Sequence, residues 1–179
     1  MAKRKKAVRK RTELVYGCWD GQLIFMDKAD ALYLADRLDA LLTSKTWGEI
    51  EKRLQPDDFK HLCEERKRPK QSGKFNGKFI YEEQGMHWIP DPLASMTSLL
   101  PPAVQTRFGR VEGGMDCEPQ LFIAETNEAG VVAHLESTGY SVTRDDELVE
   151  ATFQYKPGRW ERLMNKHHLV GTLGAGSDS

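Results

Sequence analysis

The chain has 179 residues, of which 39% are hydrophobic, and its 26 basic and 27 acidic residues give a formal net charge of −1. This length suits one domain, and with glycine added the hydrophobic content lies in the globular range, which excludes a wholly disordered chain; no run approaches the roughly 18 apolar residues of a membrane span. Cys18, Cys63 and Cys117 are odd in number and have no CxxC spacing, which indicates neither a disulfide framework nor a zinc knuckle. We therefore expect a soluble, cytoplasmic protein without a membrane partner.

The first eleven residues, MAKRKKAVRKR, are strongly basic. They contain seven lysines and arginines and no acidic residue, and without them the other 168 residues carry 19 basic and 27 acidic side chains, a net charge of −8. The apolar run that a secretion signal requires does not follow, because Asp20 and Gly21 come too soon. We predict a disordered basic leader over 1–11, with the cations Lys3, Arg4, Lys5, Lys6, Arg9, Lys10 and Arg11.

After the leader, the segment ELVYGCWDGQLIFM predicts a β-hairpin. Its two apolar runs are joined by Asp20-Gly21, a dipeptide that favours the positive φ angles of a tight turn. Alanines and leucines at helical spacing then predict a helix over about 28–42, with Asp27 as its cap.

Two more helix starts follow. Thr46 and Glu49 have the spacing of a capping box, and Pro56 can begin a further helix, since its first turn needs no amide hydrogen there. Residues 12–65 are therefore expected to form a lobe in which a hairpin is covered by three helices.

Residues 66–78, RKRPKQSGKFNGK, contain six basic residues and no acidic one. The proline, the glycines and Asn76-Gly77 predict an exposed basic linker or hairpin tip, which leads into a strand over 78–83. We place the main internal boundary here, with a second α+β lobe over 79–168. The cations expected to meet phosphate are Arg66, Lys67, Arg68, Lys74 and Lys78, and Phe75 and Phe79 beside them can stack a base. A solvated turn whose lysines keep the sheet edge soluble explains the same residues.

The start of the second lobe is punctuated by proline. Prolines confine any helix to about 93–100, and Pro101 either ends that helix or begins another through Arg107. Residues 108–119 are expected as a loop. From Gln120 onward, QLFIAE predicts a strand, Asn127 a helix cap, Gly139 a helix end and YSVT another strand. This order predicts a strand-helix-strand unit whose strands need not be neighbours.

The end of the chain has two interpretations. Residues 151–163, divided by Pro157-Gly158, are consistent with a last hairpin, with a helix over 158–167 as the alternative, and 169–179 have the composition of a flexible tail. We therefore predict an α+β fold of antiparallel β-hairpins packed by short α-helices, with one strand-helix-strand unit in the C-terminal half.

The most enzyme-like stretch is GMHWIPDP, with His87 and Asp91 on a predicted loop. There His87 can act as a general base oriented by Asp91 or Glu82, with Cys117 as a nucleophile or His134 as a further member. A surface histidine and a helix-capping aspartate explain the same residues, and the acidic neighbours of Cys117 raise the pKa of its thiol. We therefore expect a protein other than an enzyme. The histidine spacings and the glycine-rich C-terminus predict neither a metal site nor a cofactor.

Basic residues are concentrated in 1–11 and 66–78 and acidic residues in 112–150, and this separation of charge favours a role in binding. The leader and the 66–78 patch predict non-specific contact with nucleic acid through phosphate neutralisation. The alternative is a protein–protein interaction module, of inhibitor or immunity type, whose acidic segment 112–150 binds a basic partner. That segment has ten acidic residues against Arg144 alone, and it can also hold the leader in cis. An enzyme with a His87/Asp91 site is the third interpretation, and the sequence does not specify the oligomeric state.

Overall fold

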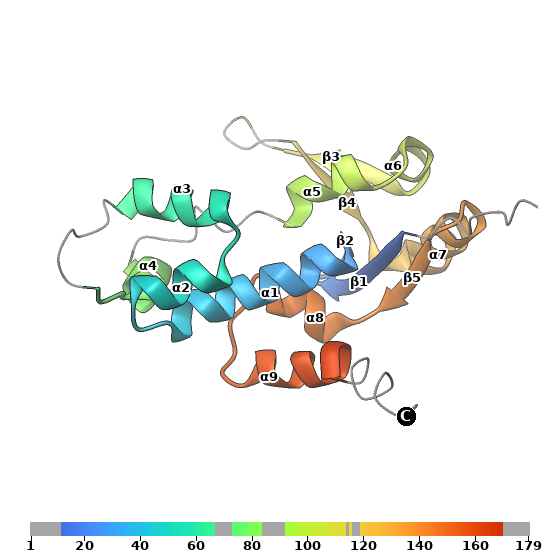
Figure 1. Ribbon diagram of the computed structural model, residues 1–179. Helices are drawn as coiled ribbons and strands as arrows, with labels where there is room; N and C mark the ends of the chain where they lie inside the picture. The colour runs from blue at the N-terminus through green and yellow to red at the C-terminus, as the bar shows by residue number, and fades with distance from the viewer. Residues whose placement is uncertain (1–11, 67–72, 84–91, 114, 116–118, 170–179) are drawn as a thin grey trace, which may run out of the picture.

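The computed structural model describes residues 12–66, 73–83, 92–113, 115 and 119–169. Within these ranges the chain has an α+β fold, in which short helices surround two small sheets (Figure 1). The larger sheet has the strand order β2-β1-β5 and the smaller one pairs β3 with β4. The strands are β1 (Glu13–Trp19), β2 (Gln22–Asp27), β3 (Gly109–Glu112), β4 (Gln120–Ile123) and β5 (Ser141–Arg144).

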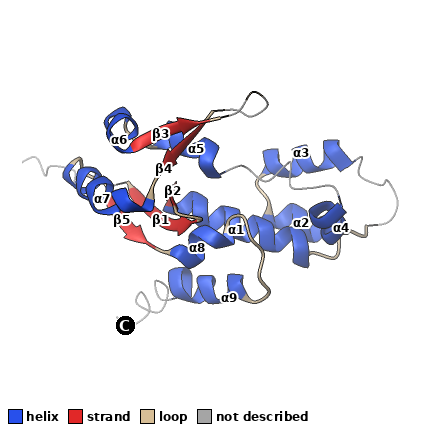
Figure 2. Ribbon diagram, turned by 180° about the vertical axis from the view of Figure 1, so that it is seen from behind, coloured by secondary structure: helices blue, strands red, loops and turns tan. Residues whose placement is uncertain are grey.

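Helices make up most of the described chain, as the view from behind shows (Figure 2). None of those that the structure describes combines the length and the apolar character needed to cross a membrane. They are α1 (Lys28–Thr43), α2 (Trp47–Arg53), α3 (Pro56–Arg66), α4 (Gly77–Glu83), α5 (Pro92–Leu99), α6 (Pro102–Phe108), the 3-10 turn η1 (Glu125–Asn127), α7 (Glu128–Ser137), α8 (Asp146–Ala151), α9 (Arg159–Met164) and the π-helical turn η2 (Asn165–Leu169).

The predicted N-terminal hairpin is confirmed, and its first strand, β1, is the central strand of the larger sheet. Asp20 and Gly21 have φ angles of 49° and 74°, the left-handed conformations that a two-residue turn of this kind requires. β1 pairs antiparallel with β2 on one side and parallel with β5 on the other, where Glu13 lies opposite Ser141. β1 has a strand on each edge and helices over both faces of the sheet, so its residues 14–17 are all buried.

The predicted strand-helix-strand unit is present as β4, α7 and β5, with its two strands in different sheets. Gly139 ends α7 with a φ of 101°, and the amides of Gly139 and Tyr140 donate back into the last turn, as in a Schellman motif. Asn127 does not cap α7 with its side chain as expected. Its Nδ2 instead donates to the Phe108 carbonyl at 3.1 Å, which ties α7 to the end of α6.

Residues 78–83, expected as a strand, form α4, so that prediction is wrong. Asn76 begins this helix because its Oδ1 accepts a hydrogen bond from the Phe79 amide at 3.1 Å. Gly77 fits directly against the backbone of Leu41 in α1, with no space for a side chain. Asn-Gly is therefore the start of a packed helix here and not a hairpin turn.

Two further expectations differ from the structure. Residues 109–112, expected as a loop, form β3, because their backbone pairs with β4. Residues 151–163, interpreted first as a hairpin, are not paired strands: Ala151 ends α8, and α9 lies within the 158–167 helix that was the alternative. Gly158, with a φ of 72°, begins α9.

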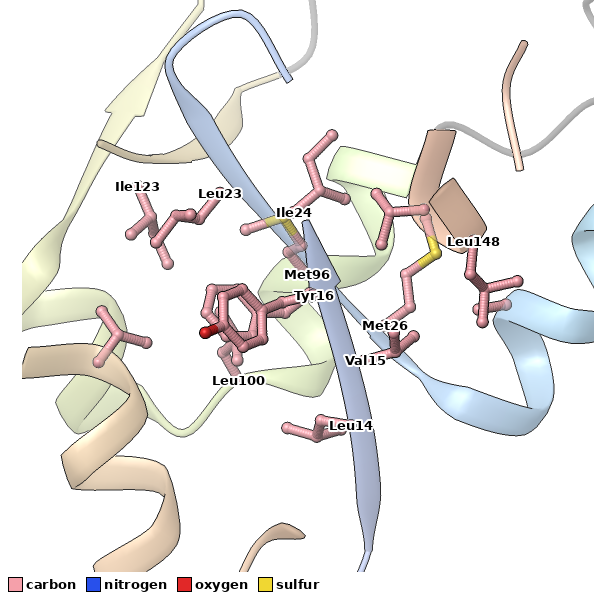
Figure 3. Packing of buried hydrophobic residues seen from close by; sticks show 14 of the residues in the cluster. Leu14, Val15, Tyr16, Leu23, Ile24, Met26, Met96, Leu100, Ile123 and Leu148 are labelled. Carbon is pink, nitrogen blue, oxygen red and sulfur yellow. The ribbon is translucent and has the colours of Figure 1, made fainter. Parts of the chain in front are cut away.

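Apolar side chains gather in two clusters. The larger one surrounds the β2-β1-β5 sheet, where Tyr16 points toward Met96 of α5 and Val15 toward Leu148 of α8, on opposite sides of β1 (Figure 3). The smaller one surrounds Trp47 and joins the end of α1 to α2, α3 and α4. Each cluster takes residues from both sides of segment 66–78.

Thr46 begins α2 as predicted. Its Oγ1 accepts from the Glu49 amide at 3.2 Å, and the Glu49 carboxylate accepts from the Lys45 amide at 2.7 Å. We expect Thr46→Ala to lower the free energy of unfolding by about 1 kcal/mol, measured by urea denaturation. Thr106→Ala, an exposed substitution inside α6, is the control and should leave stability unchanged or slightly higher. Equal losses in both variants would contradict the capping role.

Candidate functional site

A polar cluster lies where β1 and β5 end. These two strands run parallel, so their carboxyl ends meet at one edge of the sheet, and α7 begins beside that edge (Figure 1). Ligand sites of open α/β sheets form at such edges. We call this group of side chains the Arg144 cluster, and it consists of Tyr16, Cys18, Glu125, Glu128, Arg144 and Asp146.

Arg144 is the centre of this cluster. Its Nη1 donates to both carboxylate oxygens of Glu128, at 2.9 and 2.8 Å, and its Nε donates to Asp146 at 2.8 Å. The Glu125 carboxylate lies 3.6 Å from Nη2. The planar guanidinium suits this arrangement because it offers several donors in fixed directions. Three carboxylates around one guanidinium leave the cluster with a net charge of −2.

Tyr16 and Glu128 hold each other in fixed protonation states. The buried Tyr16 hydroxyl donates to Glu128 at 2.8 Å, and burial together with this bond raises the pKa of Tyr16 to about 12. The hydrogen bonds from Tyr16 and Arg144 lower the pKa of Glu128 below its usual value. At neutral pH Tyr16 therefore keeps its proton and Glu128 is a carboxylate without a proton to transfer.

Cys18 and Asp146 complete the cluster. The Asp146 carboxylate accepts from the Cys18 amide at 2.7 Å, and the hydrogen bond from Arg144 lowers the pKa of Asp146. Burial and the neighbouring Glu125 raise the pKa of the Cys18 thiol, which is the opposite of what a nucleophilic cysteine needs. Among the residues described, no histidine, cysteine and carboxylate side chains gather as a group that could hold a metal ion.

A shallow, open groove of about 610 Å³ runs along the exposed side of α7 beside this cluster, and we call it the α7 groove. Its middle is apolar, formed by Ala129, Val132 and Ala133, and its rim is acidic. Glu136, at the end of the groove away from Arg144, is exposed and makes no ion pair with any described residue. The remaining lining residues are Tyr16, Glu125, Thr126 and Glu128.

The acidic segment 112–150 divides into two parts in the structure. The carboxylates at positions 145, 147 and 150 are paired with cations of residues 156–166, so they attach the C-terminal helices to α8. The carboxylates of the α7 groove are the part that faces solvent along a concave surface. The structural pairs are Asp145–Lys166, Glu147–Arg162, Glu150–Lys156 and Glu150–Arg159, with nitrogen–oxygen distances of 2.8 to 3.1 Å.

Much of the predicted nucleic-acid surface lies outside the described residues. This part comprises the leader 1–11, Lys67, Arg68 and the side chain of Arg66. Lys74 and Lys78 are exposed, as that prediction needs. Phe75 is not available to stack a base, because it is buried edge-to-face against Trp47 with ring centres 4.9 Å apart. Phe79 is 47% exposed. Contact with nucleic acid stays a prediction.

The leader and the 66–78 patch adjoin opposite ends of α1. Glu13, which follows the leader, lies 3.6 Å from Lys28 at the start of α1, while Gly77 lies against Leu41 near its end. At 1.5 Å per residue, these two points of α1 are about 20 Å apart. Figures 1 and 2 both show α4 and α7 at opposite ends of the molecule. The described residues that adjoin the two basic regions, Glu13 and Gly77, therefore lie at opposite ends of α1.

Most of the candidate catalytic residues also lie outside the part of the chain that the structure describes. His87, Asp91 and Cys117 lie beyond the described residues, as does the side chain of Glu82, and His134 is half-buried on α7. Sequence reasoning did not single out Tyr16, Cys18 or Glu125 as site residues. The available signal was Arg144, the lone base of a strongly acidic segment.

The α7 groove can accept a cation. The long stem of a lysine or arginine can lie on its alanine and valine surface while the charged head reaches a rim carboxylate. The pKa shifts of Tyr16, Cys18 and Glu128 give none of these three groups the character of an activated nucleophile or base. Comparison of the chain with protein-family models, curated proteins and solved structures gave no match.

Proposed function

We propose that the protein is a protein–protein interaction module that binds a basic segment of a partner in the α7 groove. The observation that carries this proposal is the surplus of negative charge on a concave, partly apolar surface. Among the described residues, the groove and the adjoining Arg144 cluster hold four carboxylates (Glu125, Glu128, Glu136 and Asp146) and one guanidinium, that of Arg144, which pairs with all of them except Glu136. Such a surface attracts a basic chain and repels a phosphate backbone.

The spacing of the groove defines the partner segment. Glu125 and Glu136 are eleven residues apart on one side of η1 and α7, roughly 16 Å at a helical rise. An extended chain covers that distance in about five residues. The preferred ligand therefore has basic residues about five positions apart, with small apolar residues between them to contact Ala129, Val132 and Ala133.

A fluorescent octalysine peptide, titrated by polarisation at several salt concentrations, tests this proposal. The chain used is full length with the seven leader cations replaced by glutamine, so that its own basic residues do not compete with the peptide. We expect Glu125→Gln with Glu136→Gln to weaken binding about tenfold, since two fixed charges are lost from the site.

The control for net charge is the pair Glu51→Gln and Glu161→Gln, two exposed carboxylates on α2 and α9 outside the groove. This variant has the same net charge as the groove variant and should bind octalysine as tightly as its parent. Equal weakening in both variants, or no measurable binding by the parent, would overturn the proposal.

A further inference from the structure

We infer that residues 1–11 occupy the α7 groove in cis, so that a basic partner binds only by displacing the chain's own leader. This inference rests on the proposed function, because it assigns a competing occupant to the same groove. It adds a regulatory property, in which the leader sets the affinity of the groove for other basic chains.

The leader joins the fold beside the groove. The Ser141 amide donates to the Thr12 carbonyl at 3.0 Å, and Glu13 lies opposite Ser141 in the β1–β5 pair. β5 begins shortly after α7 ends at Ser137, so Thr12 lies beside the C-terminal end of α7. Glu136, the unpaired carboxylate of the groove among the described residues, is at this same end.

The leader is long enough to cover the groove. Eleven extended residues span up to about 36 Å, and the groove from Glu136 to Glu125 covers roughly 16 Å. The chain has to turn back at Thr12 to follow α7 toward the Arg144 cluster. A reversal of direction uses about four residues, which leaves enough leader for the full groove.

The order of residue types in the leader matches the order in the groove. The leader has basic residues at 3–6, the apolar pair Ala7-Val8, and basic residues at 9–11. The groove has acidic residues near Arg144, the apolar surface of Ala129, Val132 and Ala133, and then Glu136. Arg9–Arg11 next to Glu136 would place Ala7-Val8 on the apolar surface and the basic residues 3–6 near Glu125.

Because the leader is part of the same chain, even a weak intrinsic affinity for the α7 groove is enough for it to occupy the groove. A ligand joined by a short flexible connection has an effective concentration in the millimolar range, so an intrinsic Kd near 1 mM gives about half occupancy. The attraction is screened beyond about 8 Å at physiological salt, so the leader has to touch the groove to be held there. Cis occupancy should therefore fall as salt is raised.

The experiment compares octalysine binding by four full-length chains, with polarisation as the readout. They are the natural chain, the chain with Lys3, Arg4, Lys5, Lys6, Arg9, Lys10 and Arg11 replaced by glutamine, and each of these with Glu125→Gln and Glu136→Gln. We expect neutralising the leader to tighten binding about three- to tenfold in the natural groove. In the variant groove the same change should have less than a twofold effect.

The outcomes separate the two proposals. If the natural and leader-neutralised chains bind octalysine equally well, cis occupancy is overturned and the proposed function stands. If neutralising the leader tightens binding equally in both grooves, the effect comes from net charge alone and cis occupancy is again overturned. If the leader-neutralised chain fails to bind octalysine, the proposed function falls, and this inference falls with it.

Discussion

Gly77→Ala is expected to lower the free energy of unfolding by about 3 kcal/mol or more. A methyl group on Gly77 would overlap the carbonyl group of Leu41 in α1 and lie 2.9 Å from the Phe75 ring. The main obstacle is helix backbone, which cannot rotate away as a side chain can. We expect α4 to separate from α1, with loss of packing around Phe75 and Trp47, and urea denaturation measures the loss.

Gly48→Ala is the matched control for this prediction. Gly48 also lies in the first turn of a short helix, α2, but it is exposed, and a methyl group there would meet nothing within 4 Å. Alanine lowers the entropy of the unfolded chain and favours helix, so this variant should gain up to about 1 kcal/mol. If both variants changed stability in the same direction, α4 would not pack against α1 as described.

Asp145→Asn is expected to cost about 2–4 kcal/mol at neutral pH. Asp145 is only 6% exposed, and its Oδ1 accepts from the Leu148 amide at 3.0 Å, which caps α8. Its Oδ2 accepts from Lys166 Nζ at 2.8 Å and lies 3.0 Å from His167 Nε2. The asparagine amide has the same shape but no charge, so the ion pair with Lys166 is lost. The contact between α8 and η2 therefore weakens.

The cost of Asp145→Asn should depend on pH. Burial alone would raise the pKa of Asp145, but hydrogen bonds from Lys166, the Leu148 amide and His167 outweigh it and hold that pKa below its usual value. An unfolded aspartate titrates near pH 3.9, so the stabilisation is present above that pH and is lost as pH falls through the lower folded pKa. The stability difference between natural chain and variant should therefore shrink as pH is lowered from 5 to 2.

Asp57→Asn is the control for Asp145→Asn, because it removes an exposed carboxylate by the same substitution. Asp57 is exposed in the first turn of α3, where a carboxylate contributes only a few tenths of a kcal/mol. Thermal unfolding of this variant should match the natural chain within about 0.5 kcal/mol at each pH. A pH-independent loss in Asp145→Asn would mean that shape, and not the ionised carboxylate, accounts for its contribution.

Local chemistry was predictable from the sequence, and tertiary pairing was not. The Asp20-Gly21 turn, the Thr46 cap and the Gly139 helix end each depend on residues within one turn of chain, and all three are confirmed. Asn76-Gly77 fits a hairpin turn and a helix start equally well, and contact with Leu41, some 36 residues away, selects the helix. β3 becomes a strand only through its pairing with β4.

The candidate site was predictable only as a region of charge. Counting residues identified 112–150 as acidic, but it could not show that Asp145, Glu147 and Glu150 are matched by cations of residues 156–166. The sequence placed Tyr16 in a buried strand and gave no sign that it belongs to a site. Its partner, Glu128, is 112 residues away in the sequence, and only the fold brings the two side chains together. Among the described residues of this segment, Glu125, Glu128 and Glu136 are the carboxylates that line the α7 groove.

Under the proposed function, Arg144 is a built-in cation of the kind that a basic ligand would bring to these carboxylates. Carboxylates gathered at one place repel each other, and a guanidinium already seated between Glu128 and Asp146 relieves most of that repulsion. Glu125, 3.6 Å from Arg144 Nη2, shares the same cation, so some repulsion remains among the three carboxylates around Arg144. A lysine that binds in the α7 groove near Glu125 would thus gain affinity from two sources. One is its own contacts, and the other is the lowering of the electrostatic repulsion among Glu125, Glu128 and Asp146.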